Sequence, residues 1–317
     1  MKHVFLIDPS AFSGQQWRMD GLLDTIGQHF RTQEKPDFTT VVSKFPREAL
    51  GIIQRQADEA EGGPVRVYAI GGDAILFDCL NGIVGLPNME LAAVPYGAAG
   101  NTFIRSFGEG KAELFKSIPA VAAAPSIPTD IIEVGNTHAL SGCAVGFSAA
   151  VVIKMRNMES GRRRSRGAGR IAAKLRRLLA GASFAFDKSI VARQYRILID
   201  GKDYSGAYSQ VSIVNAPHFG GAKAPLAGAA PDDGLLDVVL FKSATMLATI
   251  GSFRKYARGK LPSNCARVKA KRVEMHSDKP MWIQTDSEYL MDTSIAFEVA
   301  PGAAQIVAVD GLSYRGS

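Results

Sequence analysis

The chain has 317 residues, of which 46% are hydrophobic and 21% charged, and its formal net charge is +7. This is the composition of a folded globular protein, and the length favours two domains over one. It excludes a membrane span, since no apolar run approaches roughly 18 residues, and it argues against disulfide and zinc frameworks, since the three cysteines are odd in number and far apart. The N-terminal MKHVFLIDPS has too short an apolar run for a signal peptide. We therefore expect a cytoplasmic protein.

Residues 1–118 alternate between two hydrophobic periodicities. Short apolar runs predict four strands, at Val4–Ile7, Phe38–Val42, Val65–Ile70 and Leu91–Val94. Helical patterns lie between them, with an apolar face at Leu22, Leu23, Ile26 and Phe30, a start near Pro46, and a third helix over Ile75–Ile83. Such alternation predicts a doubly wound α/β domain with a parallel sheet, in which ligands bind beyond the carboxyl ends of the strands.

The pattern changes after Pro119, where short β-rich segments are separated by Gly, Asp and Asn turns. They lie at Asp130–Val134, Ala139–Val145, Tyr195–Ile199, Ala207–Asn215, Leu235–Phe241, Ala266–His276, Met281–Thr285 and Ile295–Val299. This predicts an antiparallel sheet or sandwich. We therefore divide the chain into an α/β domain over residues 1–118 and a β-rich domain over residues 119–300, with residues 301–317 returning to the first domain.

A basic insertion, over residues 154–180, interrupts the β-rich domain. From Lys154 to Arg177 ten basic residues face one acid, so this segment carries +9 and the rest of the chain −2. The spacing predicts a helix over residues 169–179 with apolar residues on one face. Such a helix either lies on an anionic membrane or is an ordinary solvated face. The candidate membrane contacts are Arg162, Arg163, Arg164, Arg166, Arg170 and Lys174. Nucleic acid is disfavoured, because no aromatic residue is interleaved with these cations.

Four separated motifs carry polar side chains suited to chemistry. They are Gly71-Gly72-Asp73 with Asp78 on the following helix, the loop from Gly97 to Asn101, Asp232-Asp233-Gly234, and Asp286-Ser287-Glu288. Taken alone, a Gly-Gly-Asp turn is equally consistent with a plain strand-to-helix connection. Glycines also let backbone N–H groups approach a phosphate, and the start of the next helix favours an anion.

In their order and spacing these motifs resemble the diacylglycerol kinase catalytic-domain family, which includes bacterial lipid kinases, sphingosine kinases and ceramide kinases. The segment from Asp8 to Gly14 is similar to the family's Asn-Pro-x-Ser-Gly turn, and Ser43 stands in place of a Thr that contacts the nucleotide. The resemblance covers nearly the whole chain. It implies an N-terminal nucleotide-binding domain similar to that of NAD kinase, a C-terminal β-sandwich domain, and an active site in the cleft between them.

The resemblance also implies roles for individual residues. Asp286 would be the base that takes a proton from the acceptor hydroxyl, and Glu288 would bind Mg²⁺ or orient Asp286. Asp73 and Asp78 would serve the nucleotide–Mg²⁺ end. Asp233 corresponds to a second, structural metal position in some bacterial members, or else lies in an ordinary Asp-Gly turn. The residues assigned to the nucleotide are Ser43, Gly71, Gly72, Asp73, Asp78, Gly97 and Asn101.

The sequence departs from the family pattern in the nucleotide loops. Ala74 replaces a glycine, which would cost about 1–2 kcal/mol if the position has a positive φ. Ile75 replaces a threonine, and the Gly97 loop has one extra residue and lacks an aspartate. In ceramide kinases, by the same resemblance, an apolar residue also follows the Gly-Gly-Asp-Gly motif, which favours a ceramide-like acceptor.

The leading hypothesis is therefore an ATP- and Mg²⁺-dependent kinase of diacylglycerol- or ceramide-type lipids, peripheral at the inner face of the membrane. The loop changes motivate an alternative, a non-catalytic lipid- or nucleotide-binding protein derived from the family. A soluble kinase such as NAD kinase would explain neither the basic insertion nor Asp286-Ser287-Glu288. We expect a lipid partner and no nucleic acid, and the sequence leaves a homodimer open.

Overall fold

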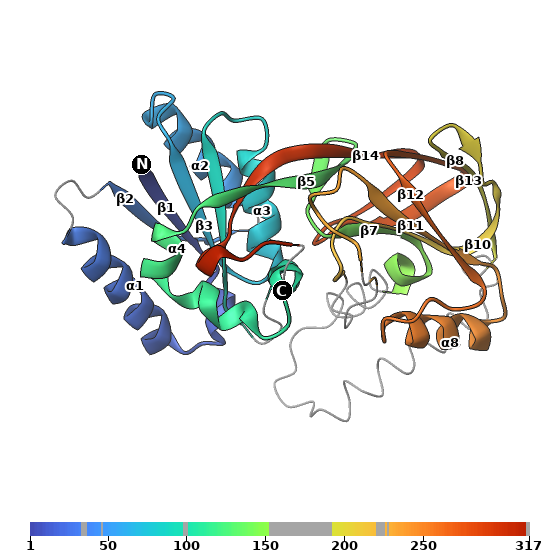
Figure 1. Cartoon of the computed structure of the whole chain (residues 1–317), viewed down its shortest axis with the longest axis horizontal. Helices are drawn as coiled ribbons and strands as arrows, with labels where there is room; N and C mark the ends of the chain where they lie inside the picture. The colour runs from blue at the N-terminus through green and yellow to red at the C-terminus, as the bar shows by residue number, and fades with distance from the viewer. Residues whose placement is uncertain are drawn as a thin grey trace.

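The computed structural model describes residues 1–32, 37–45, 47–97, 101–151, 192–219, 226 and 228–314. Figure 1 shows two halves, an α/β half that contains the N-terminus and a β-rich half, joined by the strands β5 (Ser126–Val134) and β14 (Tyr289–Val307). Within these residues, no helix combines the length and apolarity that crossing a membrane requires. The basic residues from Arg162 to Lys174 that we expected to contact the membrane lie outside the described residues.

The α/β half is a parallel sheet covered on both faces. Its strands β1 (Lys2–Ile7), β2 (Phe38–Val42), β3 (Val65–Gly71) and β4 (Met89–Pro95) lie in the order β2-β1-β3-β4. The helices are α1 (Gln16–Arg31), α2 (Glu48–Glu59), α3 (Asp73–Ile83) and α4 (Ile118–Ala123). Four 3-10 helices complete it, η1 (Pro9–Phe12), η2 (Phe103–Phe107), η3 (Lys111–Lys116) and η4 (Val309–Gly311). Because α1 contacts α4 while α2 contacts α3, the doubly wound prediction is confirmed.

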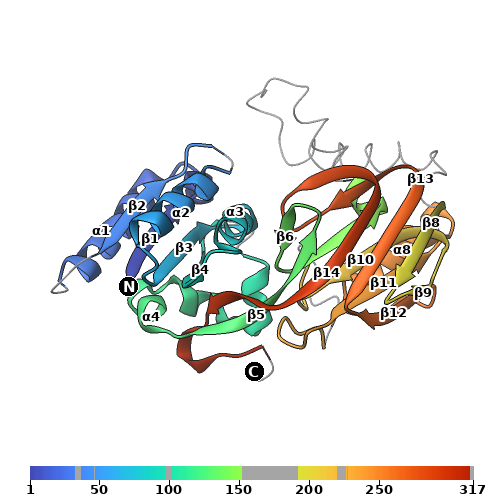
Figure 2. The ribbon, with the colours of Figure 1, turned by 90° about the horizontal axis from the view of Figure 1, so that it is seen from above.

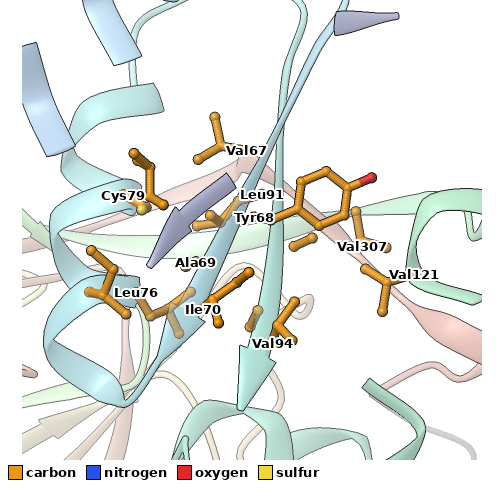
Figure 3. Packing of buried hydrophobic residues seen from close by; sticks show 14 of the residues in the cluster. Val67, Tyr68, Ala69, Ile70, Leu76, Cys79, Leu91, Val94, Val121 and Val307 are labelled. Carbon is orange, nitrogen blue, oxygen red and sulfur yellow. The ribbon is translucent and has the colours of Figure 1, made fainter. Parts of the chain in front are cut away.

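The central strand β3 shows why hydrophobic residues here do not simply alternate with polar ones. All seven of its residues are buried. In Figure 3, Val67 points to the face covered by Leu76 and Cys79 of α3, while Tyr68 points to the opposite face, toward Val121 of α4. A strand buried on both faces is apolar at most positions rather than at alternate ones. Its one charged residue, Arg66, is buried because it forms an ion pair with Glu90 at 2.7 Å.

The β-rich half is an antiparallel sandwich. Its further strands are β6 (Thr137–Ala139), β7 (Gly142–Gly146), β8 (Arg193–Ile199), β9 (Lys202–Asp203), β10 (Gly206–Val214), β11 (Leu236–Lys242), β12 (Cys265–Ala270) and β13 (Arg272–Gln284). Both β10 and β13 pair with β7 at one end and with β8 at the other, so the strands close around an apolar core. The predicted fold class is confirmed for this half too. One helix, α8 (Met246–Tyr256), was not expected from the sequence.

The two halves share one hydrogen-bonded sheet. The first part of β14 pairs with β13, and its end pairs with β5, where Ile306 also lies opposite Leu91 of β4. β5 and β14 therefore cross between the halves as a paired ribbon, visible in Figure 2. Hydrogen bonding along this ribbon fixes the approach of the two halves more tightly than two unpaired linkers would.

Candidate active site

The predicted nucleotide residues gather at one edge of the parallel sheet. Parallel strands end at the same edge, and backbone hydrogen bonds tie their exits together there. Ser43 N donates to Ile7 O at 2.8 Å, and Tyr96 N donates to Gly71 O at 3.1 Å. The structure thus brings Ser43, Gly71 and Gly97 to neighbouring strand ends, as the sequence predicts.

Gly71 is required at the end of β3 by close packing. A Cβ on Gly71 would lie 2.8 Å from Cγ2 of Ile75 and 3.0 Å from Cβ of Asp8. Gly72 then forms the N-cap of α3 without a side-chain hydrogen bond. The first N–H groups of α3 have no partner within the helix, and the helix dipole is positive at this end. The turn can therefore receive a phosphate.

Ala74 is not strained. It is the second residue of α3, is exposed, and has helical backbone angles rather than a positive φ. The cost that we attached to a positive φ therefore does not apply, and the argument that the alanine weakens the loop is wrong. The neighbouring Ile75 is 4% exposed and packs over Gly71, so its apolar side chain has a structural role.

Replacing Ala74 by glycine is expected to leave nucleotide affinity unchanged. Since glycine is a poorer helix former, we expect the free energy of unfolding to fall by about 0.5–1 kcal/mol. Calorimetric titration with ADP and urea unfolding measure the two quantities. A clear gain in affinity for ADP would mean that the position needs the backbone freedom of glycine after all.

Asp73 links the two nucleotide loops. Its carboxylate accepts one hydrogen bond from Thr102 N and one from Thr102 Oγ1, both at 2.6 Å. The adjacent Asn101 accepts from Ile104 N at 3.3 Å, while its Nδ2 is buried and has no acceptor within the described residues. Thr102 was not singled out from the sequence, although its place beside Asn101 was a usable signal. Residues 98–100 of this loop lie outside the described residues.

Asp286 lies in a nest of three backbone N–H groups from consecutive residues, the last of which is the first residue of β7. Its carboxylate accepts from Leu140 N at 2.6 Å, from Ser141 N at 2.9 Å, and from Gly142 N at 3.0 Å. Burial and, to a smaller extent, the negative charge of Asp73 raise the pKa of Asp286 to about 6, against the lowering effect of these hydrogen bonds. The carboxyl is thus held in one orientation and titrates just below neutral pH.

The nest is itself fixed by Asn215 at the end of β10. Asn215 Nδ2 donates to Leu140 O at 2.9 Å and to Asp130 O at 2.7 Å, and Asn215 N donates to Ser141 O at 2.9 Å. Asn215 is 1% exposed. This asparagine therefore positions the three donors around Asp286, a role that the sequence did not reveal.

Arg47 connects the two halves at the site. Its guanidinium donates to Glu288, with Nε 2.6 Å from Oε1, and its backbone N donates to Asp78 Oδ2 at 2.9 Å. Arg47 precedes α2 with φ 64°, a left-handed conformation. Burial raises the pKa of Asp78, and the charge of Glu288 adds to this shift. The predicted residues Asp78 and Glu288 therefore face each other across an arginine that the sequence analysis missed.

Asp233 has a lysine as its cationic partner. Lys269 Nζ lies 2.6 Å from Asp233 Oδ2 and 3.4 Å from Asp237, and Leu235 N donates to Asp233 Oδ1 at 3.0 Å. Over the described parts of the chain, no three His, Cys, Asp or Glu side chains converge as a set of metal ligands. The structural metal at Asp233 stays a prediction, and the Lys269 ammonium already supplies positive charge at this position.

Comparison with known proteins matches both halves. Residues 2–134 match the model described as diacylglycerol kinase catalytic domain, and residues 170–308 match that of the YegS C-terminal NAD kinase beta sandwich-like domain. A Staphylococcus aureus (strain JH9) protein named "Putative lipid kinase" is 24% identical over 251 residues, 78% of each chain. Two solved Bacillus anthracis (strain Sterne) structures also align over 98% of each chain. One, titled "Crystal structure of a putative diacylglycerol kinase", has a TM-score of 0.71 at 20% identity, and the other, of "a diacylglycerol kinases", has 0.68 at 21%.

The two matched domains follow one another in the same order as the two halves of the structure. Of the site residues, Asp73 lies in the first matched domain and Asp286 in the second. Residues 2–134 therefore belong to the diacylglycerol kinase catalytic-domain family, and the relatives that the chain matches over 78% of its length are named as lipid kinases, which are phosphotransferases.

Proposed function

We propose that this protein is an ATP- and Mg²⁺-dependent lipid kinase that phosphorylates a primary hydroxyl of a diacylglycerol- or ceramide-type lipid. The observation that carries the proposal is the setting of Asp286. A carboxylate with a pKa of about 6, held by three backbone donors, lies close enough to Asp73 at the nucleotide end to feel its charge. A base beside a phosphate-binding turn is what transfer of a phosphoryl group to a hydroxyl requires.

Asp286 would act as the general base. At neutral pH most of it is ionised, because its pKa is about 6. The lipid hydroxyl gives its proton to the Asp286 carboxylate as the hydroxyl oxygen forms a bond to the γ-phosphorus. The bond between that phosphorus and the bridging oxygen breaks, and the electron pair leaves with ADP. Ser141 N donates to both carboxylate oxygens, and its longer bond, to Oδ1 at 3.2 Å, is the one that the lipid hydroxyl would replace.

The nucleotide would bind at the strand ends of the α/β half. The N-terminus of α3 at Gly72 and the turn at Gly97 offer backbone N–H groups to its phosphates. Asn101 Nδ2 is a buried donor that lacks an acceptor among the described residues, which suits a nucleotide oxygen. The Ser43 hydroxyl lies at the neighbouring strand end, where it donates to Phe45 O at 3.0 Å.

Asp73 fits a role as a carboxylate ligand of a nucleotide-bound Mg²⁺. Each of its oxygens accepts one hydrogen bond from Thr102 and keeps a further acceptor site. Mg²⁺ in kinases commonly uses one or two carboxylates together with phosphates and water, so a larger protein cage is unnecessary. When bound, the metal would neutralise phosphate charge. Glu288 fits this role less well, because its carboxylate already pairs with Arg47.

Arg47 would stabilise the charge of the transferred phosphoryl group. Its side chain is 63% exposed, and Glu288 and Asp78 hold it at the junction of the two halves. A guanidinium suits this task because it offers several donors in a fixed plane.

Two substitutions of Arg47 are expected to separate catalysis from stability. Arg47→Gly relieves a positive φ that costs a non-glycine residue about 1 kcal/mol, so stability should be kept or gained while kcat falls about 10–100-fold. Arg47→Lys keeps the charge but not the fork of donors, and we expect an intermediate kcat. Steady-state kinetics and urea unfolding measure both effects. Unchanged kcat in Arg47→Gly would contradict the role.

The slight preference for ceramide came from Ile75, and the packing of Ile75 on Gly71 explains that residue without reference to the acceptor. The non-catalytic alternative lost part of its motivation when Ala74 proved to be helical. We propose a peripheral enzyme at the cytoplasmic face of the membrane, where such lipids are accessible.

The direct test is a lipid-panel assay. Purified protein is incubated with labelled ATP, Mg²⁺ and mixed micelles that contain diacylglycerol, ceramide or a sphingoid base, beside an active control kinase. Labelled phospholipid with the first or second acceptor supports the proposal. Absence of any labelled lipid across the panel, with an active control, overturns it.

A further inference from the structure

A second basic run surrounds the helix α8. From residue 242 to residue 272 the sequence contains no acid and nine basic residues, Lys242, Arg254, Lys255, Arg258, Lys260, Arg267, Lys269, Lys271 and Arg272. This run follows β11 and passes through α8, β12 and the start of β13. It is separate from the basic insertion at residues 154–180, so the chain has a second local concentration of positive charge, although acids elsewhere outweigh it in the net charge outside the insertion.

The basic residues of this run fall into two groups. On β12 and β13, Arg267 pairs with Asp237 at 2.7 Å, Lys269 with Asp233 at 2.6 Å, and Arg272 with Glu274 and Glu298. By contrast, the cations of α8 and its flanks are exposed and form no ion pair with any described residue; these are Lys242, Arg254, Lys255, Arg258 and Lys260. Lys271, between β12 and β13, is likewise exposed without an ion pair among the described residues but lies away from α8 in the sequence. Ion pairs with nearby carboxylates neutralise the first group, while the second group presents uncompensated positive charge to solvent.

The inner face of α8 is firmly packed. The ring of Phe253 stacks on Phe241 of β11, with centroids 4.9 Å apart, and Tyr256 meets the same ring edge-on at 5.1 Å. Thr245 caps the helix by accepting from Ala248 N. This packing fixes which residues of α8 point outward.

The outer face of α8 combines cations with protruding leucines. Over α8 and the two residues that follow it, the exposed residues are Leu247, Ala248, Gly251, Arg254, Lys255, Ala257 and Arg258. Leu247, Gly251, Arg254 and Arg258 recur among them at helical spacing on one side. Leu247 is 83% exposed, and Leu261, just beyond the helix beside Lys260, is 49% exposed. Figure 1 shows α8 along the outside of the β-rich half, away from the α/β half.

We propose that this outer face, formed by Leu247, Arg254, Lys255, Arg258, Lys260 and Leu261, docks on an anionic lipid surface. Basic side chains beside an exposed apolar one match the boundary between charged headgroups and acyl chains, where leucine enters the apolar layer and arginine stays at the headgroups. Nucleic acid would not use the leucines, and the exposed residues of this face include no aromatic side chain on which a base could stack. The purpose of the docking, to bring the site to a lipid acceptor, rests on the proposed function, but the docking itself does not.

Sedimentation with vesicles tests the surface directly. The full-length protein is mixed with phosphatidylcholine vesicles, with or without phosphatidylglycerol. We expect binding only with the anionic lipid, and release as salt rises from about 0.1 M to about 1 M. The triple variant R254Q/K255Q/R258Q should bind at least ~10-fold more weakly. The matched control R196Q/K202Q/K279Q removes three exposed charges from β8, β9 and β13, with the same change of net charge, and should bind like the wild type.

The leucines give a second, charge-neutral test. Leu247→Ser should weaken binding to anionic vesicles about 3–10-fold without changing the charge. Binding by the triple α8 variant that equals the wild type, or an equal loss in the control, overturns the proposal. So does a selective loss of oligonucleotide binding in the α8 variant with vesicle binding intact.

Catalysis separates this inference from the proposed function. With a water-soluble short-chain diacylglycerol, the triple variant should phosphorylate at the wild-type rate, since Arg254, Lys255 and Arg258 lie outside the site. Wild-type protein that binds vesicles through α8 but phosphorylates no lipid refutes the kinase and leaves the docking surface standing. Active protein whose α8 variant binds vesicles as before refutes the docking surface alone.

Discussion

Replacing Asp286 by asparagine is expected to lower kcat for lipid phosphorylation by about 10²–10⁴-fold. The substitution removes the carboxylate that would take the hydroxyl proton. An asparagine has one acceptor oxygen and one donor amide, so it can satisfy only part of the nest formed by Leu140, Ser141 and Gly142. Labelled-lipid kinetics measure the loss. Binding of ADP, which involves the other half of the protein, should persist within a few-fold and shows that the variant is folded.

The same carboxyl predicts the pH dependence of the reaction. The pKa of Asp286 is raised to about 6, and the base must be ionised to act, so kcat/KM should rise with pH and level off above about 7. Since the charge of Asp73 contributes to this shift, Asp73→Asn should move the acidic limb to lower pH in addition to reducing the rate. If kcat/KM instead stays constant from about pH 5 to about pH 8, Asp286 is excluded as the base.

Replacing Asp130 by alanine is expected to lower the free energy of unfolding by about 3 kcal/mol or more. Asp130 is 3% exposed, and its two carboxylate oxygens accept from Gly234 N at 2.7 Å and from Gly302 N at 2.8 Å. Hydrogen bonds to a charged acceptor contribute about 1.5–3 kcal/mol each, and the alanine would leave both N–H groups without their acceptor. These bonds tie the Asp233-Gly234 turn and β14 to β5.

Urea unfolding, followed by circular dichroism, measures this effect through the shift of the midpoint at constant slope. Asp278→Ala, which removes an exposed carboxylate on β13, is the matched control and should stay within about 0.5 kcal/mol of the wild type. A loss below about 1 kcal/mol in Asp130→Ala would contradict the linking role that we assign to this residue.

The sequence predicted those parts of the fold that depend on a local pattern of residues. The run of β3, apolar except for Arg66, predicted a strand of the parallel sheet, and the Gly-Gly-Asp turn after it predicted a strand-to-helix connection at the edge where ligands bind. The strand and the turn depend on a few neighbouring residues, and each has a periodicity or a turn chemistry of its own. Asp286, by contrast, was singled out by its resemblance to a family motif.

The residues that complete the site were missed because their roles depend on distant partners. Arg47 lies 241 positions from Glu288, and Asn215 lies 75 from Leu140. Neither partner can be inferred from the residues around it. Asp130 was noticed only as the start of a strand, although it holds Gly234 and Gly302 in place.

By itself, then, the sequence determined the two-domain architecture and the strand ends that carry the nucleotide motifs, and its resemblance to a family indicated the acid that serves as the candidate base. The tertiary structure decided three further matters: the backbone angles of Ala74, the cross-domain contact of Arg47, and which cations near α8 stay unpaired. The physical reason is the same in each case. Periodicity and turn chemistry are local properties of a chain, whereas strain, ion pairing and exposure depend on which distant groups packing brings within a few ångström.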